Sequence, residues 1–449
     1  MKHSLPVILL ALGLSTCPIA FGMESEQPSD PAETFLTESE DTKALSPRLP
    51  LNELRVFAEA FDRISTAYVE EIDDRTLLEN AIKGLLSQLD PHSAYLDKST
   101  FSDLQENTTG NYGGVGLEVS MDRGFVTIIS PMDDTPAQKA GLESGDVILQ
   151  IDDVTVKGMS LSETIEAMRG EPGSDVQLSI AREGETQPLD ITLTRQIIQV
   201  ASVKQRLLED GFGYIRIAQF QSATGQEVRS AVDKLTEEGK LFGLVLDLRN
   251  NPGGLLQTAV EVSDVFIDDG LIVYTEGRLS QSAQRYNAST LDQTRGVPLI
   301  VLVNEGTASA SEIVAGALQD HQRAVIMGTS TFGKGSVQTV LPLNNEIAIK
   351  LTTALYFTPN GRSIQAEGIV PDIWVERSTV TKVKSNPFRI KEKDLAGHLA
   401  NGDKNPEVVA EDKDDDTVDL STTDYQLNEA LTLLKGINIL AAKSKQPKG

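Results

Sequence analysis

Two stretches in the middle of the chain are almost continuously apolar. Residues 241–248 and 298–303 are built mainly of Leu, Ile and Val. A strand with one face in water alternates apolar and polar side chains, so runs of this kind predict strands that are covered on both faces. Because strand and helix patterns alternate from residue 196 to 375, this region is predicted to form an α/β core.

The segment ahead of this core, residues 99–195, is predicted to be rich in strands. A glycine turn at residues 112–116 runs directly into an alternating strand. Further strands are expected at 125–129, 145–151, 175–181 and 189–194, and short helices at 136–142 and 161–169. This order of elements resembles a PDZ domain.

The start of the chain has the pattern of an export signal. Lys2 supplies a positive charge, residues 5–14 are almost wholly apolar, and small residues follow at positions 20–22. The apolar run is too short to span a bilayer but suits a cleaved signal. We therefore expect a signal peptide at residues 1–22 and a flexible acidic leader at residues 23–50.

The only cysteine of the chain, Cys17, lies inside this signal. Its removal would leave a mature protein without disulfides, even in an oxidising compartment. Lipid attachment at Cys17 is the weaker alternative, because Thr16 is a poor residue in front of a lipidated cysteine.

Helical and polar segments flank the two central regions. Residues 51–98 are predicted to form an N-terminal helical region, with one helix near residues 75–89 and an earlier one with an apolar face formed by Leu51, Leu54, Phe57, Phe61 and Ile64. Residues 376–424 are polar and are predicted to be a linker, and residues 425–449 a final helix and tail. The net charge of −26 argues against binding to nucleic acid, whose phosphates it would repel.

Ser309 follows the second apolar run and precedes a helical pattern. Its neighbours at 307–311 are small. A strand-to-helix turn of this kind exposes a hydroxyl, and the start of the helix offers unpaired N–H groups to an oxyanion. Capping of the helix by serine is the plain alternative, but Ser311 is expected to be the cap because it directly precedes the helical run. Ser309 is therefore a candidate nucleophile.

A serine needs a base, and lysine is the best candidate. None of the three histidines beyond the signal, which are His92, His321 and His398, lies in a motif that would place it against Ser309. Lys334 has a glycine on each side, and both Phe332 and Val337 nearby are apolar. A lysine base must be neutral, so its pKa must fall through desolvation. Gln338, at i + 4 from Lys334, carries a neutral amide that would orient the amine without holding the proton on it.

Two further motifs bear on the chemistry. Residues 328–334 match a phosphate-binding P-loop as far as its lysine, but Gly335 replaces the required Ser or Thr and a strand pattern follows. Phosphate binding is therefore not expected. Residues 249–254 (Arg-Asn-Asn-Pro-Gly-Gly) end a buried strand in a glycine turn, whose N–H groups would complement that of Ala310; a plain turn is the alternative.

Together these motifs resemble those of the carboxyl-terminal processing peptidases, also called tail-specific proteases. The matching segments, in order, are residues 89–95 (Leu-Asp-Pro-His-Ser-Ala-Tyr), 112–116, 249–254, 307–312 and 333–338. The resemblance implies a core related to the crotonase and Clp protease folds, with an inserted PDZ domain and helical extensions at both ends. It also implies a serine endopeptidase that uses no cofactor or metal.

The resemblance assigns roles to individual residues. It implies Ser309 as nucleophile, Lys334 as base and Gln338 as the orienting amide. The implied oxyanion-hole residues are Gly253, Gly254 and Ala310. The implied peptide-binding residues of the PDZ domain are Gly113, Gly114, Val115, Gly116, Leu117 and Arg169. For Arg169 the alternative is an ordinary surface salt bridge.

The resemblance also bears on partners and location. It implies polypeptide substrates that are captured through their C-terminal tails, a periplasmic or envelope location, assembly through the terminal helices, and in some members an adaptor protein. Two other functions stay open from the sequence. One is a PDZ-based binding protein with an inactive core, and the other is a crotonase-like acyl enzyme without a serine nucleophile.

Overall fold

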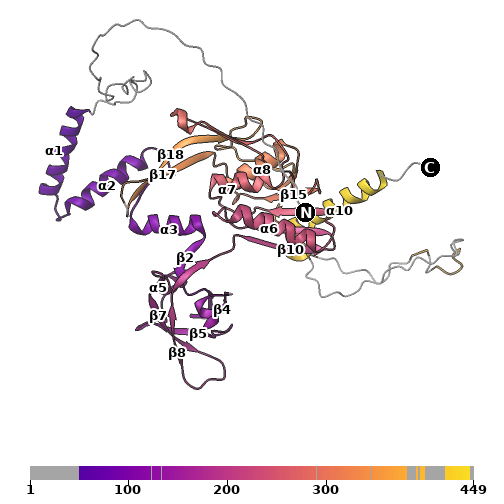
Figure 1. The fold of residues 1–449 in the computed structure, drawn as a ribbon, viewed down its shortest axis with the longest axis horizontal. Helices are drawn as coiled ribbons and strands as arrows, with labels where there is room; N and C mark the ends of the chain where they lie inside the picture. Colours follow the sequence, from indigo (N-terminus) through magenta and orange to yellow (C-terminus); the bar gives the residue numbers. More distant parts are fainter. Residues whose placement is uncertain are drawn as a thin grey trace, which may run out of the picture. The chain divides into compact units, whose positions relative to one another are not determined.

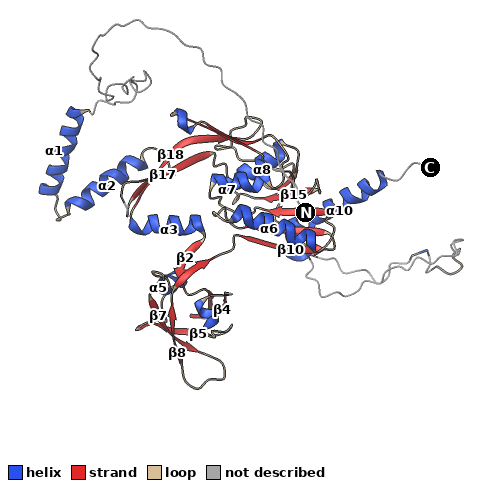
Figure 2. Cartoon of the chain, in the orientation of Figure 1, coloured by secondary structure: helices blue, strands red, loops and turns tan. Residues whose placement is uncertain are grey.

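The computed structural model describes residues 50–122, 124–132, 134–289, 291–344, 346–381, 391–392, 395–399 and 420–444. The predicted signal peptide, Cys17 and most of the predicted leader and polar linker lie outside these residues. The chain divides into two units, residues 1–78 and 79–449. Figures 1 and 2 show their helices and strands.

In the first unit, helix α1 (Leu51–Ala67) confirms the predicted amphipathic helix. It buries no residue, and Leu51 and Phe57 of its apolar face are exposed. Helix α2 (Asp74–Ser87) begins in this unit and matches the second predicted helix closely. An apolar helix face left in water favours a further partner, since its burial would be stabilising.

A six-stranded sheet forms the centre of the second unit. Its order is β10 (Val203–Glu209), β11 (Phe212–Ile217), β12 (Gly243–Asp247), β15 (Leu299–Val303), β16 (Val325–Gly328) and β19 (Ile373–Trp374). All neighbours are parallel except β10, which is antiparallel to β11. Every residue of β12 and β15 is buried, as their apolar runs predicted.

Helices cover both faces of this sheet. Helices α6 (Thr224–Glu237), α7 (Leu256–Asp264) and α8 (Ala310–Asp320) pack on the face that carries Leu244 and Leu246 of β12. Helix α10 (Tyr425–Ser444) packs on the opposite face, against Val245. Alternate residues of one strand therefore enter two separate cores, which explains why the strand has no polar face.

A second sheet supports the motifs that are predicted to be catalytic. It contains β1 (Ala94–Leu96), β18 (Ala348–Phe357), β13 (Leu271–Gly277) and β14 (Gln284–Asn287), and β17 (Ser336–Pro342) pairs with β18. The segment after residue 335 is thus a strand, as predicted, and not the helix that a P-loop would require. Strand β1 brings the segment that follows α2 directly alongside β18.

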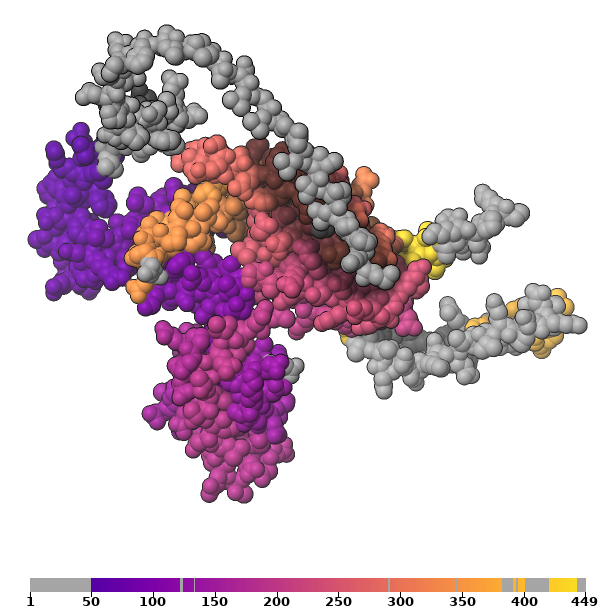
Figure 3. Space-filling model, in the orientation of Figure 1, coloured from indigo at the N-terminus to yellow at the C-terminus, as the bar shows by residue number. Residues whose placement is uncertain are grey.

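The PDZ prediction is confirmed by a separate sheet and core. The sheet order is β3 (Leu117–Asp122), β4 (Phe125–Pro131), β5 (Val147–Ile151), β7 (Asp175–Ala181) and β8 (Leu189–Thr194), with β6 (Val154–Thr155) on β5. Helices α4 (Pro136–Lys139) and α5 (Leu161–Met168) complete it. Its apolar residues form a cluster of their own, and its atoms gather into a compact body (Figure 3).

One element differs from the sequence prediction. Residues 100–109, predicted to begin the strand-rich region, belong instead to helix α3 (Lys98–Thr109). The side chain of Asp97 caps this helix by accepting from the Thr100 N–H at 3.0 Å, and Gly110 ends it in a left-handed conformation. The helix has few apolar residues, so its sequence lacks the periodic apolar pattern that predicts a helix. The ribbon of β2 (Asn111–Gly114) and β9 (Gln196–Gln199) then joins the PDZ domain to its flanking segments.

Candidate active site

Ser309 lies where strand β15 turns into helix α8. Its backbone has φ 57° and ψ −116°, a conformation that non-glycine residues rarely adopt. The structure places Ser309, and not Ser311 as predicted, at the N-cap position. Ser311 lies inside the helix, and its hydroxyl donates to the carbonyl of Asn251 at 3.0 Å. The prediction of Ser311 as the cap is therefore wrong, because the helix begins earlier than its apolar pattern.

Glu312 is the reason that the helix begins there. Its carboxylate accepts from the Ser309 N–H at 2.8 Å, from the Gly333 N–H at 2.7 Å and from the Lys334 N–H at 2.9 Å. The hydroxyl of Thr331 also donates to it. Burial raises the pKa of Glu312, and these hydrogen bonds oppose the rise. One buried carboxylate thus joins the turn that carries Ser309 to the loop that carries Lys334.

Sequence reasoning did not single out Glu312. The available signal was an acid three residues after a serine at a helix start, the pattern of a capping box. That pattern predicts the bond to the Ser309 N–H, but it contains nothing about the loop at residues 331–334.

Lys334 is half-buried and lines the same pocket as Ser309. Burial lowers the pKa of Lys334, and the nearby charge of Lys350 lowers it further. Asp90 and Glu312 act in the opposite direction. Phe332 does not provide the predicted apolar cover, because it is 62% exposed. Within the described residues, no hydrogen bond joins the Lys334 amine to the Ser309 hydroxyl.

Gln338 also lines this pocket but is bonded elsewhere. Its Nε2 donates to Ser336 Oγ at 2.9 Å and to Thr352 Oγ1 at 3.4 Å. No hydrogen bond connects it to Lys334 in the part of the chain that the structure describes. The three predicted catalytic residues are therefore gathered in one place without being hydrogen-bonded to one another.

Tyr356 completes this group and was not anticipated. Its side chain is buried, its hydroxyl donates to the Lys334 carbonyl, and it interacts with the side chain of Ser309. Burial raises the pKa of Tyr356 well above its ordinary value, so the phenol stays neutral. A tyrosine inside a strand gives no local signal of such a role.

The pocket that contains these groups has a volume of about 700 Å³. Apolar side chains from several elements form much of its wall, among them Phe101, Leu104, Leu256, Ile313 and Val337. Phe101 and Leu104 come from α3, so the helix that the sequence did not reveal forms part of the wall. A cleft with an apolar wall and a few polar groups suits a peptide chain.

The predicted oxyanion donors meet at the Ser309 turn. A Cβ on Gly253 would lie 2.8 Å from Ser309 Cβ and 2.9 Å from the Ala310 nitrogen, so only glycine fits there. The N–H of Gly253 donates to Asn251 Oδ1 at 2.9 Å. By contrast, the N–H groups of Gly254 and Ala310 have no acceptor among the described residues. Two of the three predicted donors are therefore free, and Gly253 provides close approach.

His92 lies nearer to the site than the sequence suggested. Burial lowers the pKa of His92, and the charge of Lys334 lowers it further. No hydrogen bond joins His92 to Ser309 within the described ranges. Nor do these ranges contain a cluster of three His, Cys, Asp or Glu side chains suited to a metal ion. None of the helices in them has the length and apolar character needed to cross a bilayer.

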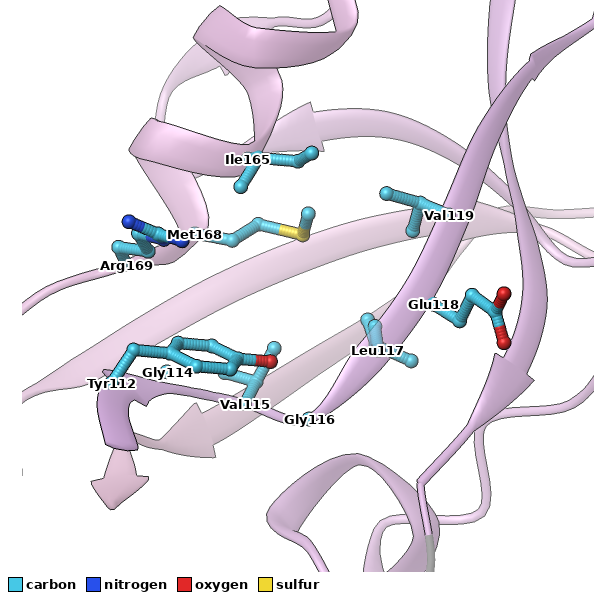
Figure 4. A pocket seen from close by; sticks show the side chains of 10 residues that line it. All are labelled: Tyr112, Gly114, Val115, Gly116, Leu117, Glu118, Val119, Ile165, Met168 and Arg169. Atoms are coloured by element: carbon cyan, nitrogen blue, oxygen red, sulfur yellow. The ribbon is translucent and has the colours of Figure 1, made fainter. Parts of the chain in front are cut away.

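A second pocket, of about 280 Å³, lies in the PDZ domain. Figure 4 shows Ile165 and Met168 of α5 facing Leu117 and Val119 of β3 across it. The N–H groups of Val115 and Gly116 find no acceptor in the described chain, and Gly114 lines the same pocket. Gly113 does not line it, and its carbonyl accepts from the Gly170 N–H at 3.1 Å. The geometry suits an extended peptide whose terminal carboxylate meets the glycine turn.

Arg169 closes one end of this pocket. Its Nη1 lies 3.2 Å from Glu106 Oε2 of α3, and its guanidinium lies 5.2 Å from the ring centre of Tyr112. It therefore makes an ion pair, the alternative reading from the sequence. However, the partner lies on the helix that forms part of the wall of the first pocket.

Three families have sequence profiles that match parts of the chain. The PDZ domain matches residues 113–193, peptidase family S41 matches residues 211–375, and the N-terminal domain of the activating protease CtpB matches residues 17–100. The region expected to resemble a PDZ domain and the α/β core thus each match a family of the predicted kind.

Whole-chain relatives agree with these profiles. The carboxy-terminal-processing protease of Bartonella bacilliformis is 46% identical over 86% of this chain and 88% of its own length. CtpB of Bacillus subtilis is 35% identical over 74% of this chain and 69% of its own length. Among solved structures, the photosystem II D1 C-terminal processing protease is 34% identical and covers 72% of this chain and 93% of its own, with a TM-score of 0.42.

Proposed function

This chain belongs to the carboxyl-terminal processing proteases of peptidase family S41, serine-type hydrolases with a PDZ domain, and we propose that Ser309 and Lys334 are its nucleophile and general base. The observation that carries the proposal is the composition of one pocket. It combines a serine at a strained turn, a half-buried lysine whose pKa is lowered, and two N–H groups without an acceptor.

The proposed reaction proceeds in two halves. The Lys334 amine takes the Ser309 hydroxyl proton as Oγ attacks the scissile carbonyl carbon. The N–H groups of Gly254 and Ala310 stabilise the oxyanion. The leaving amine receives the proton from Lys334, and the acyl group stays on Oγ as an ester. Water then attacks this ester, Lys334 takes its proton, and the new C-terminus is released as Ser309 regains its hydrogen.

The hydrogen bonds around Ser309 and Lys334 favour the interpretation that this structure is a resting form of the enzyme. Lys334 and Ser309 must come into hydrogen-bond contact for proton transfer, and they lack that bond here. Free enzymes often tighten such contacts only when substrate binds. We therefore expect substrate binding to complete the arrangement, with Gln338 orienting the lysine amine.

The pH dependence of cleavage tests whether neutral Lys334 is the base. Because burial and Lys350 lower its pKa, kcat/KM should rise with pH through a pKa below the ordinary lysine value of 10.5. Replacement of Lys350 by methionine removes a positive charge beside Lys334. The pKa of Lys334 then rises, and the acidic limb of the profile should move to higher pH.

The matched control is Lys240→Met, which removes an exposed lysine elsewhere on the core and should leave the limb in place. The other charged or titratable groups that face Lys334, namely Asp90, His92 and Glu312, stay the same in both variants. A limb that does not move in Lys350→Met would contradict the assignment of Lys334 as the titrating base.

We further propose that the PDZ domain captures substrate tails in the pocket between β3 and α5. Ile165→Glu places a charge in the apolar part of this pocket. The expected result is at least about a tenfold loss of affinity for a peptide with an apolar C-terminus, because the charge must be desolvated there. Fluorescence anisotropy on full-length Ser309→Ala protein measures this without cleavage. Ile129→Glu, on an exposed position of the same domain, is the control and should bind normally.

Arg169 offers a route from tail capture to the catalytic pocket. It lines the peptide pocket, and its ion pair to Glu106 reaches α3. A peptide carboxylate that attracts Arg169 would weaken this pair. We propose that this exchange moves α3, and with it one wall of the catalytic pocket.

Location and assembly are proposed from the termini. The signal-like pattern of residues 1–22 supports export to the periplasm, where the substrates would be envelope proteins. The exposed apolar face of α1, and Ile439 and Leu440 on α10, favour an oligomer formed through terminal helices. An adaptor that presents substrates is compatible with the same surfaces.

The alternative is a PDZ-based binding protein whose core cuts only with an adaptor, or not at all. The missing bond between Lys334 and Ser309 is the observation that favours it. Binding of C-terminal peptides without cleavage of any unfolded protein, with and without envelope extract, would support this alternative.

A further inference from the structure

The loop at residues 90–93 (Asp-Pro-His-Ser) has no role in the reaction as described, yet it is bonded to the strand beside Gln338. Asp90 Oδ1 accepts from the N–H groups of His92 at 2.8 Å and Ser93 at 2.9 Å. Asp90 Oδ2 accepts from Ser93 Oγ at 2.7 Å. The loop is attached to β18 by two bonds, from Thr352 Oγ1 to Asp90 Oδ1 and from Thr352 N–H to Ser93 Oγ, each 3.1 Å.

Thr352 connects this loop to Gln338. The two residues are cross-strand partners in the pairing of β17 with β18, and Gln338 Nε2 donates to Thr352 Oγ1 at 3.4 Å. A hydroxyl carries one hydrogen, and an ionised carboxylate can only accept. The hydrogen of Thr352 must therefore point at Asp90, which leaves a lone pair for Gln338.

The consequence is a defined orientation of the Gln338 amide. Its NH₂ end is held by Thr352 and by Ser336, so its carbonyl Oε1 is the end left for Lys334. We propose that Asp90 and Thr352 are positioning residues that determine which end of the Gln338 amide Lys334 meets. This inference rests on the proposed role of Lys334 as base.

The two ends of an amide have opposite effects on a neutral lysine. Oε1 accepts one N–H of the amine, so the nitrogen lone pair stays free to face the Ser309 hydroxyl. The NH₂ end would instead donate to that lone pair and compete with the proton of Ser309. An isolated glutamine turns its amide easily. The chain of hydrogen bonds from Gln338 through Thr352 to Asp90, called the relay below, removes this freedom.

The relay also keeps the carboxylate at a distance from the base. A carboxylate bonded directly to Lys334 would hold the proton on the amine. Asp90 raises the pKa of Lys334, and Lys350 on β18 opposes it. Through Thr352, Asp90 orients Gln338 without itself bonding to Lys334.

The test compares three single variants on a peptide substrate. Thr352→Val removes the hydroxyl, and kcat should fall about tenfold with KM unchanged, because the lysine is misoriented in part of the molecules. Thr352→Ser keeps the hydroxyl and should retain the wild-type kcat. Thr353→Val is the matched control, since the next residue of β18 bonds to Thr339 at 2.7 Å and away from Gln338. Thermal melting checks that all three fold.

A double variant separates the relay from general damage to the strand. In a Gln338→Ala background, Thr352→Val should cause no further loss of kcat, since the two residues act as one unit. The relay is contradicted by a wild-type kcat in Thr352→Val, by an equal loss in both backgrounds, or by a Thr352→Ser variant as slow as Thr352→Val. Cleavage by Ser309→Ala would instead contradict the proposed function itself.

Discussion

Replacement of Ser309 by alanine is expected to reduce cleavage of an unfolded protein by about 10⁴-fold or more. The variant lacks the oxygen that is proposed to form the acyl ester, and only binding and oxyanion stabilisation remain. The fold should survive, because the Ser309 N–H still donates to Glu312 without the hydroxyl. Gel-based cleavage assays, together with thermal melting, measure both effects.

Chemical labelling tests directly whether the Ser309 hydroxyl is the reactive group. A serine-directed phosphonate should modify Ser309 in the wild type and leave the alanine variant unmodified, as peptide mass spectrometry would detect. Ser230→Ala, an exposed serine of α6, is the control and should cut and label normally. Undiminished cleavage by Ser309→Ala would rule out the serine mechanism, and absence of a phosphonate adduct would favour a crotonase-like acyl enzyme.

The second large effect is expected for Glu312→Gln. An amide keeps one acceptor oxygen but turns an NH₂ group toward the donors that the carboxylate serves, which are the N–H groups of Ser309, Gly333 and Lys334. Because these groups are buried, we expect the free energy of unfolding to fall by about 2–4 kcal/mol. Since the segments that carry Ser309 and Lys334 lose their common anchor, kcat/KM should fall by about 10²-fold or more.

Denaturant titration and steady-state kinetics measure these two losses separately. The matched control is Glu227→Gln, which removes a carboxylate that accepts from Ser202 and from the Val203 N–H, none of which lines the catalytic pocket. It should lower stability while leaving kcat unchanged. A Glu312→Gln variant that loses stability but keeps the wild-type kcat would show that Glu312 only supports the fold.

Local patterns were sufficient for most elements of the fold. The apolar runs of β12 and β15 correctly predicted buried strands, because a strand buried on two faces disfavours polar side chains along its length. The periodic apolar residues of α1 and α8 predicted both helices, except that α8 begins before its apolar pattern. Helix α3 was missed because it has no apolar stripe, and it depends on the Asp97 cap and on the segments around it.

The residues of the candidate site also fall into two groups, those that local sequence patterns identified and those that they did not. Ser309 and Lys334 could be selected because each lies in a local context that suits its chemistry, a strand-to-helix turn and a loop with flanking glycines. Glu312, Thr352 and Tyr356 could not, because their roles depend on partners far away in the chain. Phe332, adjacent in sequence to the Gly333–Gly335 loop, turned out to be exposed.

The sequence by itself determined the class of the protein, the order of its domains and the two residues on which the chemistry is proposed to depend. These follow from periodicity, from turn residues and from motifs, all of which act over a few neighbouring positions. Only the tertiary structure decided how burial and distant charges act on Lys334, which N–H groups stay free for an oxyanion, and how Asp90 reaches Gln338. Desolvation and hydrogen bonding depend on distances in space. Those distances are set by the pairing of β1 and β17 with β18, which local sequence patterns do not reveal.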